Sequence, residues 1–152
     1  DIKILEVLQK NCKLPIKAIA FKLNLPITTV YAKIKRMEEL KVIKGYKAIL
    51  DYGKIGKETL AFILVSVAYR PLSEETLISQ REIAEEISKF PEVQEVHIIS
   101  GDWDLLIKAR AENVDAIGKF VIDKLRTVKG IQKTLTCMVF ETIKEDPALI
   151  LE

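Results

Sequence analysis

Residues 15 to 40 read PIKAIAFKLNLPITTVYAKIKRMEEL, and this stretch decides the fold of the first third of the chain. Pro15 suits the first turn of a helix whose apolar residues recur at helical spacing through Leu23. Asn24 tolerates the left-handed conformation that a tight turn needs, and Pro26 opens a longer helix to about Leu40. A short helix, a tight turn and a longer helix are the plan of a helix-turn-helix.

The longer helix has two faces of different chemistry. At about 100° per residue, four apolar side chains fall within an arc of roughly 80° and predict the buried face: Ile27, Val30, Ile34 and Met37. The opposite face carries small hydroxyls and an alanine, with cations behind them. In a major groove, hydroxyls and methyls meet base edges while Lys and Arg meet phosphates. We therefore expect these residues to contact double-stranded DNA: Thr28, Thr29, Tyr31, Ala32, Lys33, Lys35, Arg36 and, beyond the helix, Lys44.

An ordinary amphipathic helix with a solvated basic face is the alternative, and the charge distribution bears on it. Residues 1–56 carry 12 Lys and Arg against 5 Asp and Glu, a net charge of +7. Residues 57–152 carry 12 against 17, a net charge of −5. A basic segment joined to an acidic one predicts two domains, the first of which meets a polyanion.

Composition narrows the class of protein. The 49% hydrophobic content of 152 residues is ample for a packed core. The longest apolar stretch, residues 59–69, is too short to cross a bilayer as a helix, and no signal segment opens the chain. Cys12 and Cys137 lie far apart, which favours a reduced, cytoplasmic protein. Because the chain opens on Asp1 without Met, we expect that a few residues precede it.

Three domain segments are expected. Residues 1–51 form the helix-turn-helix domain, which ends in a strand-like stretch, 42–51, that can act as a wing. Residues 52–58 form a hinge. Residues 59–152 form a second domain with strands at 59–69, 93–100, 104–110 and 131–143. Between them lie a helix carrying Leu77, Ile83, Ala84 and Ile87 and a helix at 114–125. The order β-α-β-β-α-β is typical of a ferredoxin-like domain, so the fold class is α+β.

The strand at 59–69 is apolar on both faces. The two helices of this arrangement cover only one face of the sheet. Leaving Leu, Ile or Val side chains exposed on the other face would forgo about 1.5–3 kcal/mol each. We therefore expect a homodimer that packs sheet against sheet, which also suits a palindromic DNA site.

The loop between the second and third strands, Ser100-Gly101-Asp102-Trp103-Asp104, holds two carboxylates around the only tryptophan. Catalysis would need a partner base, a nucleophile or a metal set, and no such motif accompanies the loop, so no enzyme is expected. The loop can bind a small zwitterion: an aspartate accepts the ammonium, while the Gly101 N–H or the hydroxyls of Thr134 and Thr136 bind the carboxylate. The alternative is a plain hairpin turn whose carboxylates cap backbone N–H groups.

The whole chain resembles the Lrp/AsnC (leucine-responsive/asparagine regulator, feast/famine) family of prokaryotic transcription factors, particularly its archaeal members. The stretches that carry the resemblance are Asp1-x-x-Ile4-Leu5-x-x-Leu8-x-x-Asn11, Val42-Ile43-Lys44-Gly45-Tyr46, Pro91-x-Val93, Gly101-Asp102-Trp103-Asp104 and Gly130-Ile131.

The resemblance implies a regulator that dimerises, commonly assembles to octamers, and binds an amino acid or related metabolite between dimers. No other cofactor and no metal is implied. Carried over to this chain, the effector site comprises Ser100, Gly101, Asp102, Trp103, Asp104, His97, Thr134 and Thr136. Two positions depart from the family pattern: Pro26 precedes the recognition helix where Ser or another capping residue is frequent, and Trp103 stands where a smaller residue or tyrosine is frequent.

Two other functions compete with this interpretation. One is an architectural protein that binds DNA with little sequence preference, and the other is a metabolite-binding regulatory subunit of an enzyme.

Overall fold

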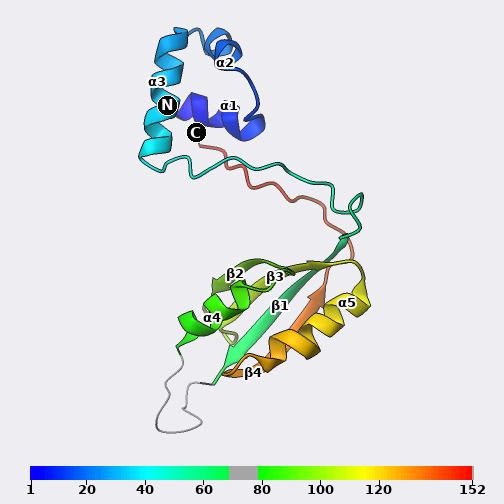
Figure 1. Cartoon of the computed structure of the whole chain (residues 1–152). Coiled ribbons are helices and arrows are strands. Elements are labelled where there is room, and N and C mark those ends of the chain that lie inside the picture. Colours follow the sequence, from blue (N-terminus) through cyan, green and yellow to red (C-terminus); the bar gives the residue numbers. More distant parts are fainter. Residues whose placement is uncertain (69–78, 152) are drawn as a thin grey trace. The chain divides into compact units, whose positions relative to one another are not determined.

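The computed structural model describes residues 1–68 and 79–151, and the chain divides into two compact units (Figure 1). The first unit comprises Asp1–Ile49 together with Ile143–Glu152, and the second comprises Leu50–Thr142. The predicted division keeps 59–152 together, whereas in the structure the last segment of the chain belongs to the first unit. The predicted positions of Tyr69, at the end of a strand, and Leu77, in a helix, lie outside the described residues.

Three helices build the first unit: α1 (Ile2–Lys10), α2 (Ile16–Leu23) and α3 (Ile27–Glu39). Asn24 joins α2 to α3 in the left-handed conformation, with φ of 54°, as the sequence predicts. Pro15 and Pro26 stand at the two N-caps in extended conformation, where their missing N–H costs nothing. Apolar side chains from all three helices meet in one core: Ile4, Val7, Ile19, Ala20, Val30, Ile34 and Met37.

The segment after α3 differs from the prediction. Lys41 ends the helix with φ of 60°, and the Ile43 N–H donates to the Met37 carbonyl at 3.1 Å. Residues 44–50 then run without regular structure. A strand needs a ladder partner, and none of the described strands pairs with them, so the strand predicted at 42–51 is absent.

The C-terminal segment is held to α1. The Gln9 side-chain amide donates to the Leu149 carbonyl at 2.9 Å, and the Leu149 N–H donates back to it at 2.8 Å. The Leu151 N–H donates to a carboxylate oxygen of Glu6 at 3.4 Å. These contacts place the last residues in the first unit.

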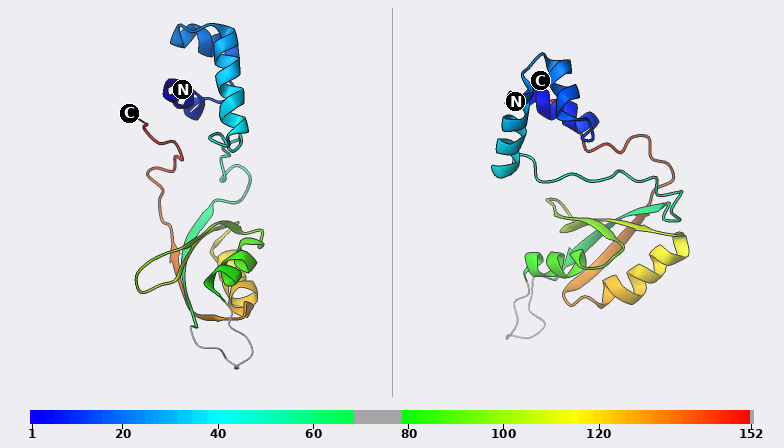
Figure 2. Two further views of the ribbon diagram at one scale, coloured as in Figure 1. Left: turned by 90° about the vertical axis from the view of Figure 1, so that its left-hand side faces the viewer. Right: turned by 45° about the horizontal axis from the view of Figure 1, so that its top comes forward.

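The second unit has the predicted element order: β1 (Thr59–Val67), α4 (Gln80–Ser88), β2 (Val93–Ile98), β3 (Leu105–Ala111), α5 (Val114–Lys119) and β4 (Ile131–Met138). The strands form one antiparallel sheet in the order β2-β3-β1-β4. Both helices cover the same face of it (Figure 2). This is the ferredoxin-like arrangement. None of the helices in the described residues is long and apolar enough to cross a membrane.

The second predicted helix forms but changes pitch. After α5 the chain makes a π-helical turn, η1 (Phe120–Lys124), and a 3-10 turn, η2 (Leu125–Thr127). The wider turn brings Phe120, Val121 and Leu125 into the core together. The last strand ends at Met138, before the predicted 143; its final register pair joins Met138 to Ala61 of β1.

The covered face of the sheet holds the core of this unit. Ile63, Val65 and Ile107 are fully buried against Ile83 of α4 and Ile117 of α5. Burying each such side chain contributes about 1.5–3 kcal/mol. Side-chain caps start both helices: Ser79 accepts from the Glu82 N–H at 3.2 Å and Asn113 from the Ala116 N–H at 2.8 Å.

Among the described residues of the second unit, no helix covers the other face of the sheet. Register and strand alternation place Phe62, Leu64, Leu106 and Leu135 on it, since Leu64 pairs with both Leu106 and Leu135. Leu135 is 45% exposed. The expected apolar second face is therefore present.

Candidate DNA-binding helix and effector loop

The helix α3 presents the predicted polar face to solvent. Thr28, Tyr31, Ala32, Lys35 and Arg36 are exposed, while Thr29 and Lys33 are half-buried on the flanks. Because Val30, Ile34 and Met37 hold the opposite side in the core, the orientation of this face is fixed. Ile27, predicted to be buried with them, is 51% exposed. It is the first residue of the helix and does not belong to the core cluster of this unit.

Two of the cations on this helix have partners. Lys33 Nζ lies 2.6 Å from Asp1 Oδ1, an ion pair that ties α3 to the start of α1. Lys35 Nζ lies 5.9 Å from the centre of the Tyr31 ring. Both partnerships are at the surface, where ion pairs and cation–π contacts are worth about 1 kcal/mol or less. A phosphate can therefore replace them.

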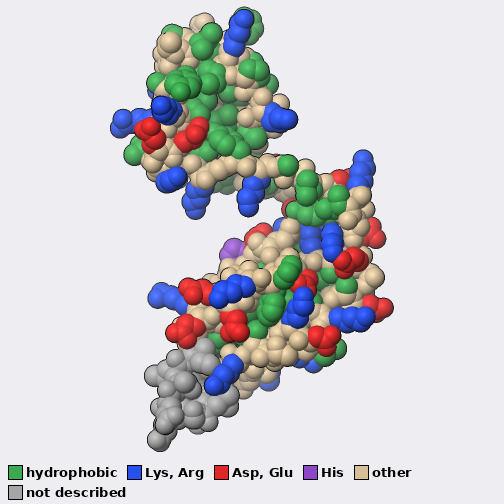
Figure 3. All heavy atoms as spheres, in the orientation of Figure 1, with side chains coloured by type: hydrophobic (Ala, Val, Ile, Leu, Met, Phe, Trp, Pro, Cys, Tyr) green, Lys and Arg blue, Asp and Glu red, His purple; other side chains and the backbone are tan. Residues whose placement is uncertain are grey.

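The segment after the helix adds exposed cations. Lys41, Lys44 and Lys47 are all exposed. The Tyr46 hydroxyl donates to Glu38 at 3.3 Å and so holds this segment beside α3. Burial, and next the Glu38 charge, raise the pKa of Tyr46 above its usual value. In the view of Figure 3, Lys and Arg dominate the charged surface of the first unit, whereas both signs mix on the second.

The loop at residues 99–104 closes the hairpin between β2 and β3. The Ile99 N–H donates to the Asp104 carbonyl at 2.9 Å, and Gly101 has φ of 105°, a conformation that favours glycine. Ser100, Gly101 and Asp102 are exposed, and Trp103 is half-buried. These atoms are available to a ligand from solvent.

The two acids of the loop have different environments. Asp104 is only 8% exposed, and its carboxylate accepts from the Val67 N–H at 2.8 Å and from Gln80 Nε2 at 3.0 Å. Asp104 thus joins the end of β1, the start of α4 and the loop. Of the two carboxylates, only that of Asp102 is exposed. The sequence leaves it open whether these acids bind a ligand or cap backbone N–H groups. Asp104 does the second, since it accepts from the Val67 N–H.

The remaining effector candidates do not converge within one chain. His97 pairs in register with Leu106, on the open face, and donates to Glu95 at 2.9 Å. Thr134 and Thr136 pair with Val65 and Ile63, whose side chains lie on the helix-covered face. His97 stands on one edge strand and the two threonines on the other. A site that uses all three needs more than one copy of the chain.

Sequence patterns missed two contacts. The first is the hydrogen bond from Gln80 to Asp104. It depends on where α4 lies, and the sequence before α4 has no strong periodicity that would place this helix. The contact of Gln9 with Leu149 joins positions 140 residues apart. The Ser79 cap is the one local signal that places Gln80 at the start of a helix.

Known protein families match both units. The profile of the Lrp/AsnC ligand-binding domain matches residues 60–149, and that of the winged helix-turn-helix DNA-binding domain matches residues 1–44. An uncharacterized HTH-type transcriptional regulator of Pyrococcus furiosus is 43% identical over 146 residues, which cover 96% of this chain and 94% of that one. The HTH-type transcriptional regulator FL11 of the same organism is 34% identical over 149 residues, with 98% and 93% covered.

Solved structures share the fold over almost the whole chain. A transcriptional regulator of Neisseria meningitidis in complex with L-Met has a TM-score of 0.88 and 27% identity, with 97% of this chain and 92% of that one covered. An AsnC-family regulator of Agrobacterium tumefaciens has a TM-score of 0.86 and 28% identity, with the same coverage.

A helix-turn-helix joined to a ligand-binding domain of this fold defines a DNA-binding transcription regulator. The chain belongs to the Lrp/AsnC family of such regulators, and the Pyrococcus relatives agree with the expected archaeal branch. It is a regulator and not an enzyme.

Proposed function

We propose that the protein binds specific DNA sites as a homo-oligomer, and that an amino acid or a similar small effector changes its assembly or its DNA affinity. The exposed face of α3 carries the proposal, because Thr28, Ala32 and Arg36 stand on it without covering side chains from the other helices of the unit. The hydroxyl and methyl groups suit base edges, and the cations suit phosphates.

The uncovered sheet face supports a homodimer. Phe62, Leu64 and Leu106 form a half-buried apolar strip beside the exposed Leu135. A second copy packed against this strip would remove it from water at about 25 cal/mol per Å² of apolar area. Two helix-turn-helix units would then meet a two-fold symmetric DNA site. Further assembly, to an octamer, is part of the same proposal.

The effector loop supports amino-acid sensing. Asp102 offers an exposed carboxylate for an ammonium group, and the backbone around Gly101 is open to a carboxylate. The Neisseria relative was solved in complex with L-Met, so a protein of this fold binds an amino acid, which supports the proposal. Because His97 lies on a different face and edge from Thr134 and Thr136, a site that combines them would form between copies, which links occupancy to assembly.

The proposed activity needs no cofactor besides the effector and takes place where DNA is, in the cytoplasm. Selection of bound sequences from a random DNA pool, repeated with each free amino acid, tests it. We expect an enriched two-fold symmetric site and at least one amino acid that alters the yield. Recovery of unenriched DNA would support an architectural protein, and no recovery of DNA would support a regulatory subunit.

A further inference from the structure

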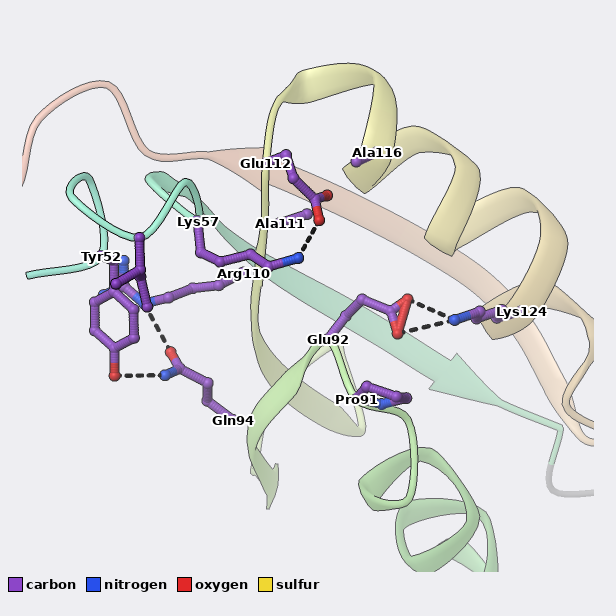
Figure 4. A pocket seen from close by; sticks show the side chains of 11 residues that line it. Tyr52, Lys57, Pro91, Glu92, Gln94, Arg110, Ala111, Glu112, Ala116 and Lys124 are labelled. Atoms are coloured by element: carbon purple, nitrogen blue, oxygen red, sulfur yellow. Dashed lines mark hydrogen bonds and ion pairs between the residues drawn. The ribbon is translucent and has the colours of Figure 1, made fainter. Parts of the chain in front are cut away.

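A cleft of about 480 Å³ lies in the second unit, at the end of the sheet where β3 finishes (Figure 4). It is formed by the hinge that precedes β1, the start of β2, the end of β3 and the start of α5. The effector loop precedes β3, at the other end of this strand, and a seven-residue strand spans about 20 Å. The cleft and the effector loop are therefore separate places.

Two ion pairs line the cleft. Lys57 of the hinge bonds to Glu112, which follows β3. Lys124 of η1 lies 2.8 Å and 3.0 Å from the two carboxylate oxygens of Glu92, which precedes β2. Three of these four side chains are roughly half exposed and only Glu92 is mostly buried. Exposed pairs are worth about 1 kcal/mol or less, so a ligand can exchange them at small cost.

A third group fastens the hinge to the sheet. The Arg110 guanidinium lies 3.9 Å from the centre of the Tyr52 ring. Gln94 donates to the Tyr52 hydroxyl at 2.9 Å and accepts from Arg110 Nε at 2.8 Å. The side chain of Tyr52 is thus held by β2 and β3 together and forms one wall of the cleft (Figure 4).

The charges of the lining select the ligand. A simple anion would meet the carboxylates of Glu92 and Glu112, and a simple cation would meet Lys57, Lys124 and Arg110. A zwitterion avoids both like-charge contacts. Its carboxylate can pair with a lysine of the cleft, and its ammonium can pair with the glutamate that this lysine releases. The volume lies within the range of small-molecule sites, roughly 300–1,000 Å³. The hydrogen bond from Lys57 lowers the pKa of the Glu112 carboxyl.

We propose that this hinge cleft is a second binding site for a free amino acid, whose charged groups re-pair with Lys57–Glu112 and Lys124–Glu92. A ligand here contacts the segment that leads directly to the DNA-binding unit. Occupancy would hold the hinge in one position and so alter DNA affinity by a path other than the effector loop. The effect on DNA affinity rests on the proposed function, whereas the binding of an amino acid in the cleft does not depend on it.

Isothermal titration of the full-length protein with each of the twenty proteinogenic L-amino acids tests the proposal. We expect at least one to bind, and Glu112→Gln to weaken its dissociation constant about tenfold or more, since a charge-assisted hydrogen bond is lost. Glu85→Gln, an exposed α4 variant, is the matched control and should bind as the wild type does. N-acetylation or methyl esterification of the same amino acid should abolish binding.

Three results would overturn the proposal: no heat with any amino acid, unchanged affinity in Glu112→Gln, or equal binding of the blocked forms. A loss in Asp102→Asn together with unchanged affinity in Glu112→Gln would assign binding to the effector loop alone. The side chain of Glu112 is about half exposed, at the surface, so its variant is expected to fold, and circular dichroism checks this. DNA selection without any amino acid tests the regulator separately.

Discussion

The carboxylate of Asp104 accepts the Val67 backbone N–H at 2.8 Å, across the gap between the hairpin loop and the end of β1. This hydrogen bond is buried, and Gln80 adds a second donor at 3.0 Å. An acid that looks in the sequence like a ligand-binding group is therefore a structural support of the loop. Asp102, two residues earlier, has an exposed side chain and is the acid available for the proposed effector contact.

Asp104→Ala should lower the free energy of unfolding by about 1–3 kcal/mol, because the Val67 N–H stays buried without its acceptor. Urea denaturation followed by circular dichroism measures the loss. Asp102→Ala is the matched control and should change stability by about 0.5 kcal/mol or less. Equal stability of the two variants would contradict the structural role of Asp104.

Lys35→Ala should weaken DNA binding about equally for all sequences and lower the slope of log affinity against log salt by about one. The reason is the loss of one phosphate contact from α3. Fluorescence anisotropy over a series of salt concentrations measures both quantities. Lys129→Ala, in the second unit, should leave the slope unchanged, and an equal effect of the two substitutions would argue against α3 as the DNA-binding element.

Leu135→Asp should dissociate the proposed dimer, because a carboxylate would be buried in the apolar contact between the open sheet faces. Sedimentation velocity should show a smaller particle than the wild type. Ile122→Asp is the control, since Ile122 is 61% exposed and lies on η1, on the helical side of the sheet. If the Leu135→Asp variant sedimented as a particle of wild-type size, the dimer interface would lie elsewhere.

Lowering the pH into the acidic range should weaken the hydrogen bond between Glu95 and His97. The hydrogen bond from His97 holds the pKa of Glu95 below its usual 4.5, with a smaller contribution from Lys108. Because the folded-state pKa is lowered, the stabilisation is complete above the usual value and is lost as pH falls through the lowered one. His97→Ala should raise the pKa of Glu95 in an NMR titration. The pKa of Glu112, lowered by Lys57, serves as an internal control. No movement for Glu95 would contradict the assigned cause.

Strong periodicity made most of the fold predictable. The left-handed turn follows from the residue type of Asn24, and the buried side of α3, except for Ile27, follows from helical spacing. Periodicity also gives the order of strands and helices. Elements that depend on partners were less predictable. The stretch 42–51 has strand-like residues, but it forms no strand, because none of the strands that the structure describes pairs with it.

The candidate site was predictable only in part. The exposed face of α3 follows from helical geometry, whereas the faces of His97, Thr134 and Thr136 depend on sheet register. A shift of one residue reverses a strand's faces, and the sequence does not determine the register. The hinge cleft was missed because its charges come from positions as distant as Lys57 and Lys124, which only the fold brings together.

The affinity of the wild-type protein for its selected DNA site, relative to a scrambled site of equal length, tests the central claim most directly. At physiological salt we expect a ratio of about 10³ or more, as for other specific DNA-binding proteins. Thr28→Ala should lower the ratio while the affinity for scrambled DNA stays the same. A ratio near one at every salt concentration would contradict sequence-specific recognition by α3.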